Sequence, residues 1–343
     1  SFWLSFEKED ISSSKSISLS KQEKNFISKI KPFGVIIFAR NISNIPQLSK
    51  LNESIKLLSK NTLIFIDQEG GIVNRFKKFK EFNFLDNFEL YKIYLRYPSL
   101  SKQLVFLKSF ITSYYLKKLN FDINTVPVLD LPIKNTILMI KKRTFGPNIH
   151  VNIILQKILI DNLSYFGLIP IMKHIPGHGV TNKDSHLTLP ITKLSKSSLQ
   201  DHIKIFKHFN KIPLAMTAHI KYLSWDKNNI ATFSSYIIDN IIRKKIGFKG
   251  LIISDDLEMN ANIYNIKDAI KLANLSKLDV ILDCSSDLDK YSEIVNSFNV
   301  SNNYVNVYKS NKLQQYKKKL DFKSININHY HELYNQLLKI NGF

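Results

Sequence analysis

Short apolar runs recur along this chain, and a longer segment with the period of an amphipathic helix follows each of them. Eight runs have the length and composition of strands: 2–6 (the weakest), 34–38, 63–66, 123–126, 168–172, 214–216, 251–253 and 280–282. The clearest helical patterns between them lie at 46–58, 101–119, 148–166, 197–210 and 234–246. Strands that alternate with helices form parallel βαβ units. Eight such units predict an α/β protein, a single-domain (β/α)8 TIM barrel with room for irregular strands.

An open, doubly wound sheet is the structural alternative to the barrel. No glycine-rich phosphate-binding loop follows an early strand, which weakens this alternative for a nucleotide-binding protein. We find no internal repeat and no linker, so we expect one domain over residues 1–343. Residues 301–343 form its C-terminal tail, with surface helices expected at 312–320 and 329–340.

The composition excludes several classes of protein. With 44% hydrophobic residues, the chain has the material for a core and is neither disordered nor collagen-like. Its single cysteine, Cys284, excludes an intramolecular disulfide and a multi-cysteine zinc site. No apolar run approaches the roughly 20 residues of a membrane helix. The first ten residues lack the basic region followed by an apolar region that a signal peptide has. The sequence begins without Met, which leaves open whether a segment was removed before Ser1.

The net charge of +21 is typical of proteins that bind nucleic acid or anionic lipid. However, only five of the 49 basic residues are Arg, and the other 44 are lysines dispersed along the chain. Ile, Asn, Lys and Ser are abundant throughout, as an AT-rich genome would produce. We therefore expect neither a nucleic-acid nor a membrane partner. The five arginines are candidates for functional roles, because the planar guanidinium makes two-point contacts with an oxygen ligand that Lys cannot make.

Polar residues follow four of the predicted strands at the point where each strand ends. These segments are Asp67–Gly71, Lys173–Gly179, Thr217–His219 and Ser254–Asp256. In a barrel, the loops after the carboxyl ends of the strands build the active site. We therefore expect these side chains to gather at one end of the barrel, where partial burial can tune their pKa values.

The segment after the strand at 168–172 carries a candidate proton shuttle. Gly and Pro residues at 176–179 turn the chain sharply, and we expect the following loop to move. On this loop Asp184 precedes His186 by two residues, so its carboxylate can orient the imidazole and stabilise the charged form. Two alternatives stay open: a solvated His186, or a metal site built from His174, His178, Asp184 and His186, although the spacing matches no familiar zinc pattern.

Two adjacent acids follow the strand at 251–253. Asp256 suits the N-cap or first turn of a helix, where an acid is favourable. Asp255, at the end of the strand, is better placed to face a ligand. A carboxylate in that position can attack an anomeric carbon and form a glycosyl ester.

Taken together, these motifs resemble glycoside hydrolase family 3, and within it the bacterial β-N-acetylglucosaminidase (β-hexosaminidase) branch. The similarity rests on KHIPGHG at 173–179, DSH at 184–186, ISDDLEM at 253–259 and DQEGGIVNR at 67–75, with support from GVIIFARN at 34–41, RTF at 143–145, TAH at 217–219 and IGF at 246–248. The motifs keep the family's order and cover roughly residues 33–284. Each motif alone would be weak, whereas the ordered set is specific.

The resemblance implies a role for each matching residue. Asp255 would be the catalytic nucleophile, His186 the acid/base and Asp184 its dyad partner. The implied substrate-binding residues are Asp67, Arg75, Arg143, Lys173, His174 and His219. Ile72 departs from the pattern, since many members carry Arg there, and we expect it to change local packing or substrate reach. Larger members take a glutamate acid/base from a second domain, which this chain is too short to hold.

The activity that the resemblance implies is retaining hydrolysis of terminal non-reducing β-linked N-acetylglucosamine from peptidoglycan-derived muropeptides. The implied enzyme is cytoplasmic and monomeric, and it needs no metal or organic cofactor. Three alternatives remain: a β-N-acetylglucosaminide phosphorylase of the same family, a non-enzymatic basic binding protein, and a catalytically dead sugar-binding member.

Overall fold

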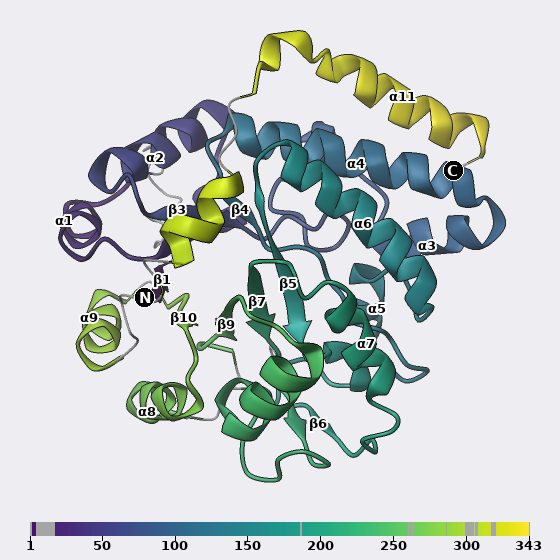
Figure 1. Ribbon diagram of the computed structural model, residues 1–343. Helices are drawn as coiled ribbons and strands as arrows, with labels where there is room; N and C mark the ends of the chain where they lie inside the picture. The colour runs from purple at the N-terminus through teal and green to yellow at the C-terminus, as the bar shows by residue number, and fades with distance from the viewer. Residues whose placement is uncertain are drawn as a thin grey trace.

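Eight parallel strands close into a barrel, in the order β1-β10-β9-β7-β5-β4-β3-β2 (Figure 1). The computed structural model describes residues 2–4, 18–185, 187–259, 261, 264–285, 287–298, 305, 308–316 and 320–342. The strands are β1 (Phe2–Leu4), β2 (Gly34–Ile37), β3 (Leu63–Ile66), β4 (Ile123–Asn124), β5 (Ile169–Ile175), β7 (Leu214–Thr217), β9 (Leu251–Asp256) and β10 (Val280–Leu282). Each lies at a predicted run, so the barrel and even its weakest strand are confirmed.

The strands form because their apolar side chains are buried on both faces. Along β2 and β3 every residue is buried, as expected for a parallel sheet that is covered by helices outside and filled by side chains inside. Alternate residues divide between two clusters: Ile36 and Phe65 fill the barrel interior, whereas Val35 and Ile64 pack toward the helices. Gly34 is required for this filling, because a Cβ there would lie 2.0 Å from the Phe65 ring.

The helices surround the barrel. They are α1 (Lys21–Ile30), α2 (Ile45–Leu58), α3 (Asn87–Arg96), α4 (Pro98–Lys118), α5 (Leu138–Arg143), α6 (Ile149–Tyr165), α7 (Gln200–His208), α8 (Ile266–Ser276), α9 (Leu288–Ser297) and α11 (Ile327–Ile340). The five predicted helical patterns are confirmed to within three residues, except that the last is a π-helix, η5 (Ile237–Ile246). The pattern could not distinguish the two, because both helix types bury one apolar stripe.

The C-terminal tail packs on the barrel. Helix α11 confirms the helix predicted at 329–340, and it lies along α4, which in turn lies beside α6 (Figure 1). The helix predicted at 312–320 is instead a short π-helix at Lys309–Leu313 that continues as a 3₁₀ turn at Gln314–Tyr316, and residues 317–319 lie outside the described part of the chain. Leu313 joins the cluster that fills the barrel interior.

Irregularities concentrate where the strands end. The register of β5 against β7 shifts between Lys173 and Ile175, and the peptide bonds Lys173–His174 and Ile175–Pro176 are cis. A two-stranded parallel sheet of β6 (Ile191–Thr192) and β8 (Lys221–Tyr222) lies outside the barrel and follows the loop that contains Asp184. Sequence patterns could not reveal this sheet, since each strand has only two residues.

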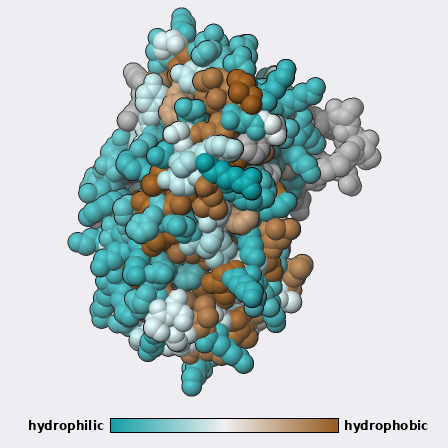
Figure 2. Space-filling model, turned by 90° about the vertical axis from the view of Figure 1, so that its right-hand side faces the viewer, coloured by the Kyte–Doolittle hydropathy of each residue, from teal (hydrophilic) through white to brown (hydrophobic). Residues whose placement is uncertain are grey.

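Polar and apolar side chains share the face of the molecule shown in Figure 2. On the face shown in Figure 2, hydrophilic side chains surround scattered apolar ones. In the part of the chain that the structure describes, no helix combines the length and the apolar character needed to cross a membrane.

Candidate active site

Asp67 lies at the carboxyl end of β3 and is held by three donors from different segments. Its Oδ1 accepts hydrogen bonds from Lys173 Nζ at 2.5 Å and Thr125 Oγ1 at 2.7 Å, and its Oδ2 accepts one from Arg75 at 2.7 Å. Burial alone would raise the pKa of Asp67, but Lys173, Arg75 and Arg143 together hold it well below its usual range. The structure thus brings together four predicted site residues and keeps the carboxylate ionised.

Glu69 joins the same network from two residues further along the chain. Arg143 grips it with two bonds, Nε to Oε2 at 2.9 Å and Nη2 to Oε1 at 2.8 Å, and Lys173 Nζ lies 2.6 Å from Oε1. Glu69 is only 4% exposed, so these contacts offset the desolvation of its charge. The sequence analysis did not assign a role to Glu69, although it follows the same strand as Asp67.

Asp130 is a fully buried acid that positions His174. Its Oδ2 lies 2.7 Å from His174 Nδ1, and its Oδ1 accepts the backbone N–H groups of His178 at 2.5 Å and His174 at 3.3 Å. Burial would raise the pKa of Asp130, but His174 holds it below its usual range. The sequence analysis missed Asp130, yet the signal was present, since it follows the strand at 123–126 toward the same end of the barrel.

His174 connects this network to Asp255. Its Nε2 lies 3.3 Å from Arg143 Nη2 and 4.0 Å from Asp255 Oδ2. Because Arg143 can only donate, this contact favours the tautomer of His174 whose proton sits on Nδ1, facing Asp130. The predicted residues His174, Arg143 and Asp255 therefore meet at the barrel mouth.

Asp255 and Asp256 point to different partners at the end of β9. The Asp255 side chain is 15% exposed, and its Oδ1 accepts the N–H of Asp256 at 2.9 Å. Asp256 accepts the N–H groups of Glu258 and Cys284, and burial, with Asp255 and Asp283 nearby, raises its pKa to about 7. The expectation that Asp256 caps a helix is corrected: it closes a turn, and α8 begins later with Asn265 as its N-cap.

The loop with the predicted dyad lies against both β5 and the segment after β9. Asp184 accepts the N–H groups of Leu187 and Thr188 through its carbonyl. Ser185 is buried, with its Oγ 3.0 Å from His178 Nε2 and its carbonyl 3.0 Å from the Ala261 N–H. His186 lies outside the described residues. The neighbouring Ser185 nevertheless ties this loop to His178, after β5, and to Ala261, after β9.

His178 and His219 are buried beneath this surface. Burial lowers the pKa of His178 to about 4, so its ring is neutral at neutral pH. The ring nitrogens of His219 contact Thr232 Oγ1 at 2.7 Å and the carbonyl oxygen of Asp256 at 3.0 Å. The sugar contact expected for His219 stays a prediction, and the geometry adds a second role, the support of the strand end that bears Asp255.

Residues at the rim bear on ligand reach and metal binding. Ile72, the departure from the family's pattern, is 41% exposed, which favours an effect on substrate reach over one on packing. Arg40 and Arg75 lie over the ring of Phe38 at 4.6 and 4.9 Å. Within the described residues, no three His, Cys, Asp or Glu side chains gather as metal ligands would. The arrangement instead places the Asp255 carboxylate beside a network of charged donors and acceptors.

Comparison with known proteins supports this interpretation. The sequence model described as "Glycosyl hydrolase family 3 N terminal domain" matches residues 8–311. A protein of Psychromonas ingrahamii named "Beta-hexosaminidase" is 31% identical over 78% of this chain and 80% of its own length. One of the same name from Haemophilus ducreyi is 30% identical over 88% and 86%.

A solved structure resembles the whole fold. The crystal structure of NagZ from Neisseria gonorrhoeae with N-trifluoroacetyl-D-glucosamine is 26% identical, with a TM-score of 0.84 over 98% of this chain and 97% of that chain. A family 3 β-N-acetylglucosaminidase from Paenibacillus has a TM-score of 0.79 at 22% identity, and this likeness concerns the fold alone.

Proposed function

The chain belongs to glycosyl hydrolase family 3, and from this premise we propose that it is a retaining β-N-acetylglucosaminidase that removes terminal non-reducing β-linked N-acetylglucosamine. The observation that most supports this proposal is the position of Asp255 at the barrel mouth, where its Oδ2 lies 4.0 Å from His174 Nε2. Relatives named β-hexosaminidase, and a neighbour solved with an N-acylated glucosamine, support the choice of sugar.

In the first step, Asp255 attacks the anomeric carbon. A bond forms between a carboxylate oxygen and C1 as the bond from C1 to the leaving oxygen breaks, through an oxocarbenium-like state. One oxygen of Asp255 accepts the backbone N–H of Asp256, and the other lies 4.0 Å from His174 Nε2, where the sugar would be held. The product of this step is a covalent glycosyl-Asp255 intermediate.

The leaving oxygen takes its proton from His186, with Asp184 orienting the ring and stabilising its cation. An unperturbed histidine pKa near 6.5 suits a group that donates in the first step and accepts from water in the second. His178 is unsuited to this role, because its pKa of about 4 keeps the ring neutral at neutral pH, and a neutral imidazole is a poor general acid. Water activated by His186 then hydrolyses the intermediate and restores Asp255.

The ion-paired network beside Asp255 would bind the sugar. Asp67 supplies an acceptor for hydroxyl groups, whereas Arg75, Arg143 and Lys173 supply donors. Their mutual contacts of 2.5 to 2.9 Å hold these groups in place before the sugar arrives, so that little reorganisation accompanies binding. His174 would contact the sugar between this network and the nucleophile.

The natural substrate that we propose is a peptidoglycan-derived muropeptide, with N-acetylglucosamine joined to anhydro-N-acetylmuramic acid. In this proposal the enzyme is a monomer of one domain that acts in the cytoplasm without a metal or organic cofactor. These finer points rest on the resemblance of its motifs to those of the bacterial branch of the family.

The test is release of 4-nitrophenol from its β-N-acetylglucosaminide, with and without phosphate. We expect turnover without phosphate and much slower turnover of the matching β-glucoside. Turnover that required phosphate and released the sugar 1-phosphate would make the protein a phosphorylase. Folded protein that was inactive under both conditions would contradict the proposed activity.

A further inference from the structure

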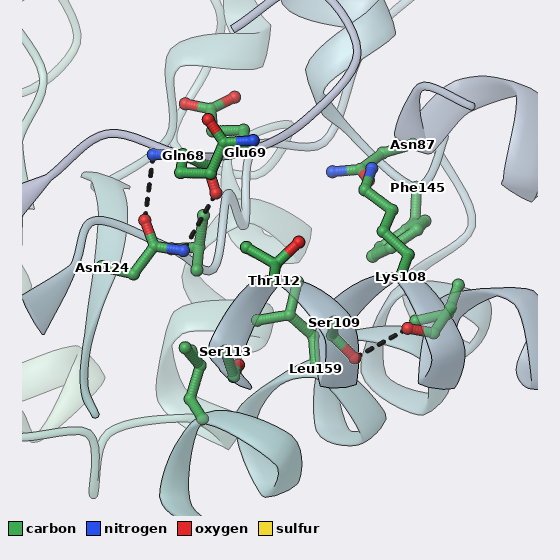
Figure 3. Close-up of a pocket in the computed structure, with 13 residues that line it drawn as sticks. Gln68, Glu69, Asn87, Lys108, Ser109, Thr112, Ser113, Asn124, Phe145 and Leu159 are labelled. Atoms are coloured by element: carbon green, nitrogen blue, oxygen red, sulfur yellow. Dashed lines mark hydrogen bonds between the residues drawn. The ribbon is translucent and has the colours of Figure 1, made fainter. Parts of the chain in front are cut away.

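Helix α4 carries a lysine whose side chain points into the protein. Lys108 is only 5% exposed, and Figure 3 shows it reaching from α4 toward Asn87, near the segment that contains Gln68 and Glu69. Removing an ammonium from water is expensive unless hydrogen bonds and charges compensate it. Since lysine is abundant on the surface of this chain, one retained in the interior calls for an explanation.

The contacts of Lys108 lead to Arg143. Its Nζ donates to the carbonyl of Leu85 at 3.1 Å and to Asn87 Oδ1 at 2.8 Å. Asn87 in turn donates through Nδ2 to the carbonyl of Arg143 at 2.9 Å. Because an ammonium can only donate, Lys108 fixes which end of the Asn87 amide faces Arg143.

The stem of Lys108 also backs the segment that carries Glu69. Gly70 follows Glu69 with φ at +79°, and a Cβ added there would lie 2.7 Å from Lys108 Cε. The aliphatic stem therefore packs against the backbone beside Glu69. Both members of the Arg143–Glu69 pair are thus supported from behind by the same side chain.

Little freedom remains around this ammonium. The Leu85 peptide is held on its other side as well, because its N–H donates to Tyr334 Oη of helix α11 at 3.0 Å. The adjoining cavity, lined in part by Glu69 and Lys108, has a volume of only about 20 Å³, roughly the space of one water (Figure 3). Lys108 therefore has no room for a distant alternative position.

We propose that Lys108 is a positioning residue: its buried ammonium holds Glu69 and Arg143 in the geometry that grips the sugar, and sugar affinity depends on its charge. This inference rests on the proposed function, because it concerns the same pocket. It adds a residue from an outer helix to the binding apparatus, and it gives helix α11 a part in supporting that apparatus through Tyr334.

The electrostatics define a pH window for the test. Burial lowers the pKa of Lys108 to about 8, whereas Asp86 and Glu69 act to raise it. Arg143, whose carbonyl accepts the Asn87 bond, is a cation of the network described above. As the pH rises from 7 to 9 the ammonium therefore loses its proton, and the grip on Asn87 weakens.

The experiment compares Lys108→Met with wild type by calorimetric titration with N-acetylglucosamine at pH 6.5 and pH 9. Methionine keeps the stem and removes the donors. We expect the Kd at pH 6.5 to rise about tenfold, which corresponds to the loss of one net hydrogen-bonding interaction. Wild type should lose a comparable part of its affinity between pH 6.5 and pH 9, whereas Lys108→Met should show no loss from this titration. Steady-state assays should show a raised KM with kcat nearly unchanged.

Lys102→Met is the matched control, since Lys102 lies on the same helix and is exposed; it should bind like wild type. If Lys108→Met does not fold, Asn87→Ala breaks the link to Arg143 while Lys108 remains, and it should weaken binding similarly. Wild-type affinity in either variant, with an active wild-type enzyme, would overturn this inference alone. A wild type that neither bound nor cleaved the sugar would overturn the proposed function and this inference with it.

Discussion

The two sides of the barrel mouth treat their carboxylates differently. On the β3–β5 side, Asp67 and Glu69 bind Arg and Lys side chains, and Asp130 binds His174. On the β9–β10 side, Asp256 accepts backbone N–H groups and Asp283 accepts bonds from Ser285. The carboxylates on both sides lose water contact on folding. The two sides therefore differ in the partners of these carboxylates, which are basic side chains on one side and backbone N–H or hydroxyl groups on the other.

The difference appears in the pKa values. Basic neighbours hold the pKa values of Asp67 and Asp130 below their usual range, whereas burial raises that of Asp256 to about 7 and also raises that of Asp283. The carboxylates of Asp67 and Asp130 therefore stay ionised near neutral pH. Fixed charges suit the binding of a sugar. The β9–β10 side holds Asp255, whose carboxylate loses its charge when the glycosyl ester forms.

The largest expected effect comes from the nucleophile. Asp255→Ala should lower kcat by about 10⁴-fold or more, because the covalent route is lost. Initial rates with the 4-nitrophenyl substrate measure this, with Asp161→Ala as a control on the exposed face of α6. A variant that retained a tenth of the wild-type rate would place the nucleophile elsewhere.

The next effect concerns the acid/base loop. Asp184→Asn should lower kcat by about 10²–10⁴-fold on substrates with poor leaving groups, because general acid catalysis is weakened. The loss should shrink with nitrophenyl leaving groups, which need less protonation. The measurement is a series of aryl glycosides of graded leaving-group pKa, with the exposed Asp201→Asn as control. An equal loss across the series would argue against a role in proton transfer.

Removing an ion pair on the β3–β5 side should lower the stability of the fold as well as sugar binding. Arg143→Met leaves Glu69 buried with Lys173 as its remaining basic partner. Removing one partner of a buried ion pair costs about 3–5 kcal/mol, so we expect a loss near the lower end of that range. Denaturant unfolding measures it, against Arg96→Met on the exposed surface of α3. An unchanged free energy of unfolding would mean that the pair adds nothing to the fold.

The β9–β10 side should respond in the opposite sense. In the folded protein Asp256 has a pKa of about 7 against 3.8 for the free side chain, so the unfolded state loses this proton first as the pH rises. The contribution of Asp256 to wild-type stability therefore falls between pH 4 and pH 7 and is level above pH 7. Asp256→Asn lacks this titration. Its stability relative to wild type should grow by up to about 4 kcal/mol across that window.

Unfolding curves at pH 4.5, 6 and 8 check the sign of this effect. Asp239→Asn, on the exposed part of η5, serves as the control for a general change in charge. A difference between variant and wild type that stayed constant with pH would show that Asp256 titrates normally in the folded state.

The barrel could be predicted from sequence because its strands coincide with short apolar runs, which are fully buried along β2, β3 and β10. The positions of Asp67, Lys173, His174 and Asp255 could also be predicted, because each lies where a strand ends. Parallel strands bring their carboxyl ends to the same end of the barrel. The boundaries of the helices were less accurate, because a capping residue such as Asn148 is only one polar residue among many until its side chain binds the helix N-terminus.

What the sequence could not reveal depends on contacts between distant segments. Asp130 follows a predicted strand by four residues, so its place near the barrel mouth could have been expected, whereas its contact with His174 depends on how the two segments pack. Glu69 lies two residues after Asp67 in the same motif, and no sequence pattern indicated a separate role for it. Its role becomes clear only from the two hydrogen bonds that it accepts from Arg143. Lys108 is one of 44 lysines, and its burial depends on how α4 packs.

The most direct test of the account is to trap the covalent intermediate. A 5-fluoro analogue of N-acetylglucosaminyl fluoride slows hydrolysis of the glycosyl ester, so intact-mass and peptide mass spectrometry can locate the bound sugar. We predict one adduct per chain, on the peptide that contains Asp255, and its absence in Asp255→Ala. No adduct on an enzyme that the analogue fails to inactivate, or an adduct on another carboxylate, would contradict Asp255 as the nucleophile.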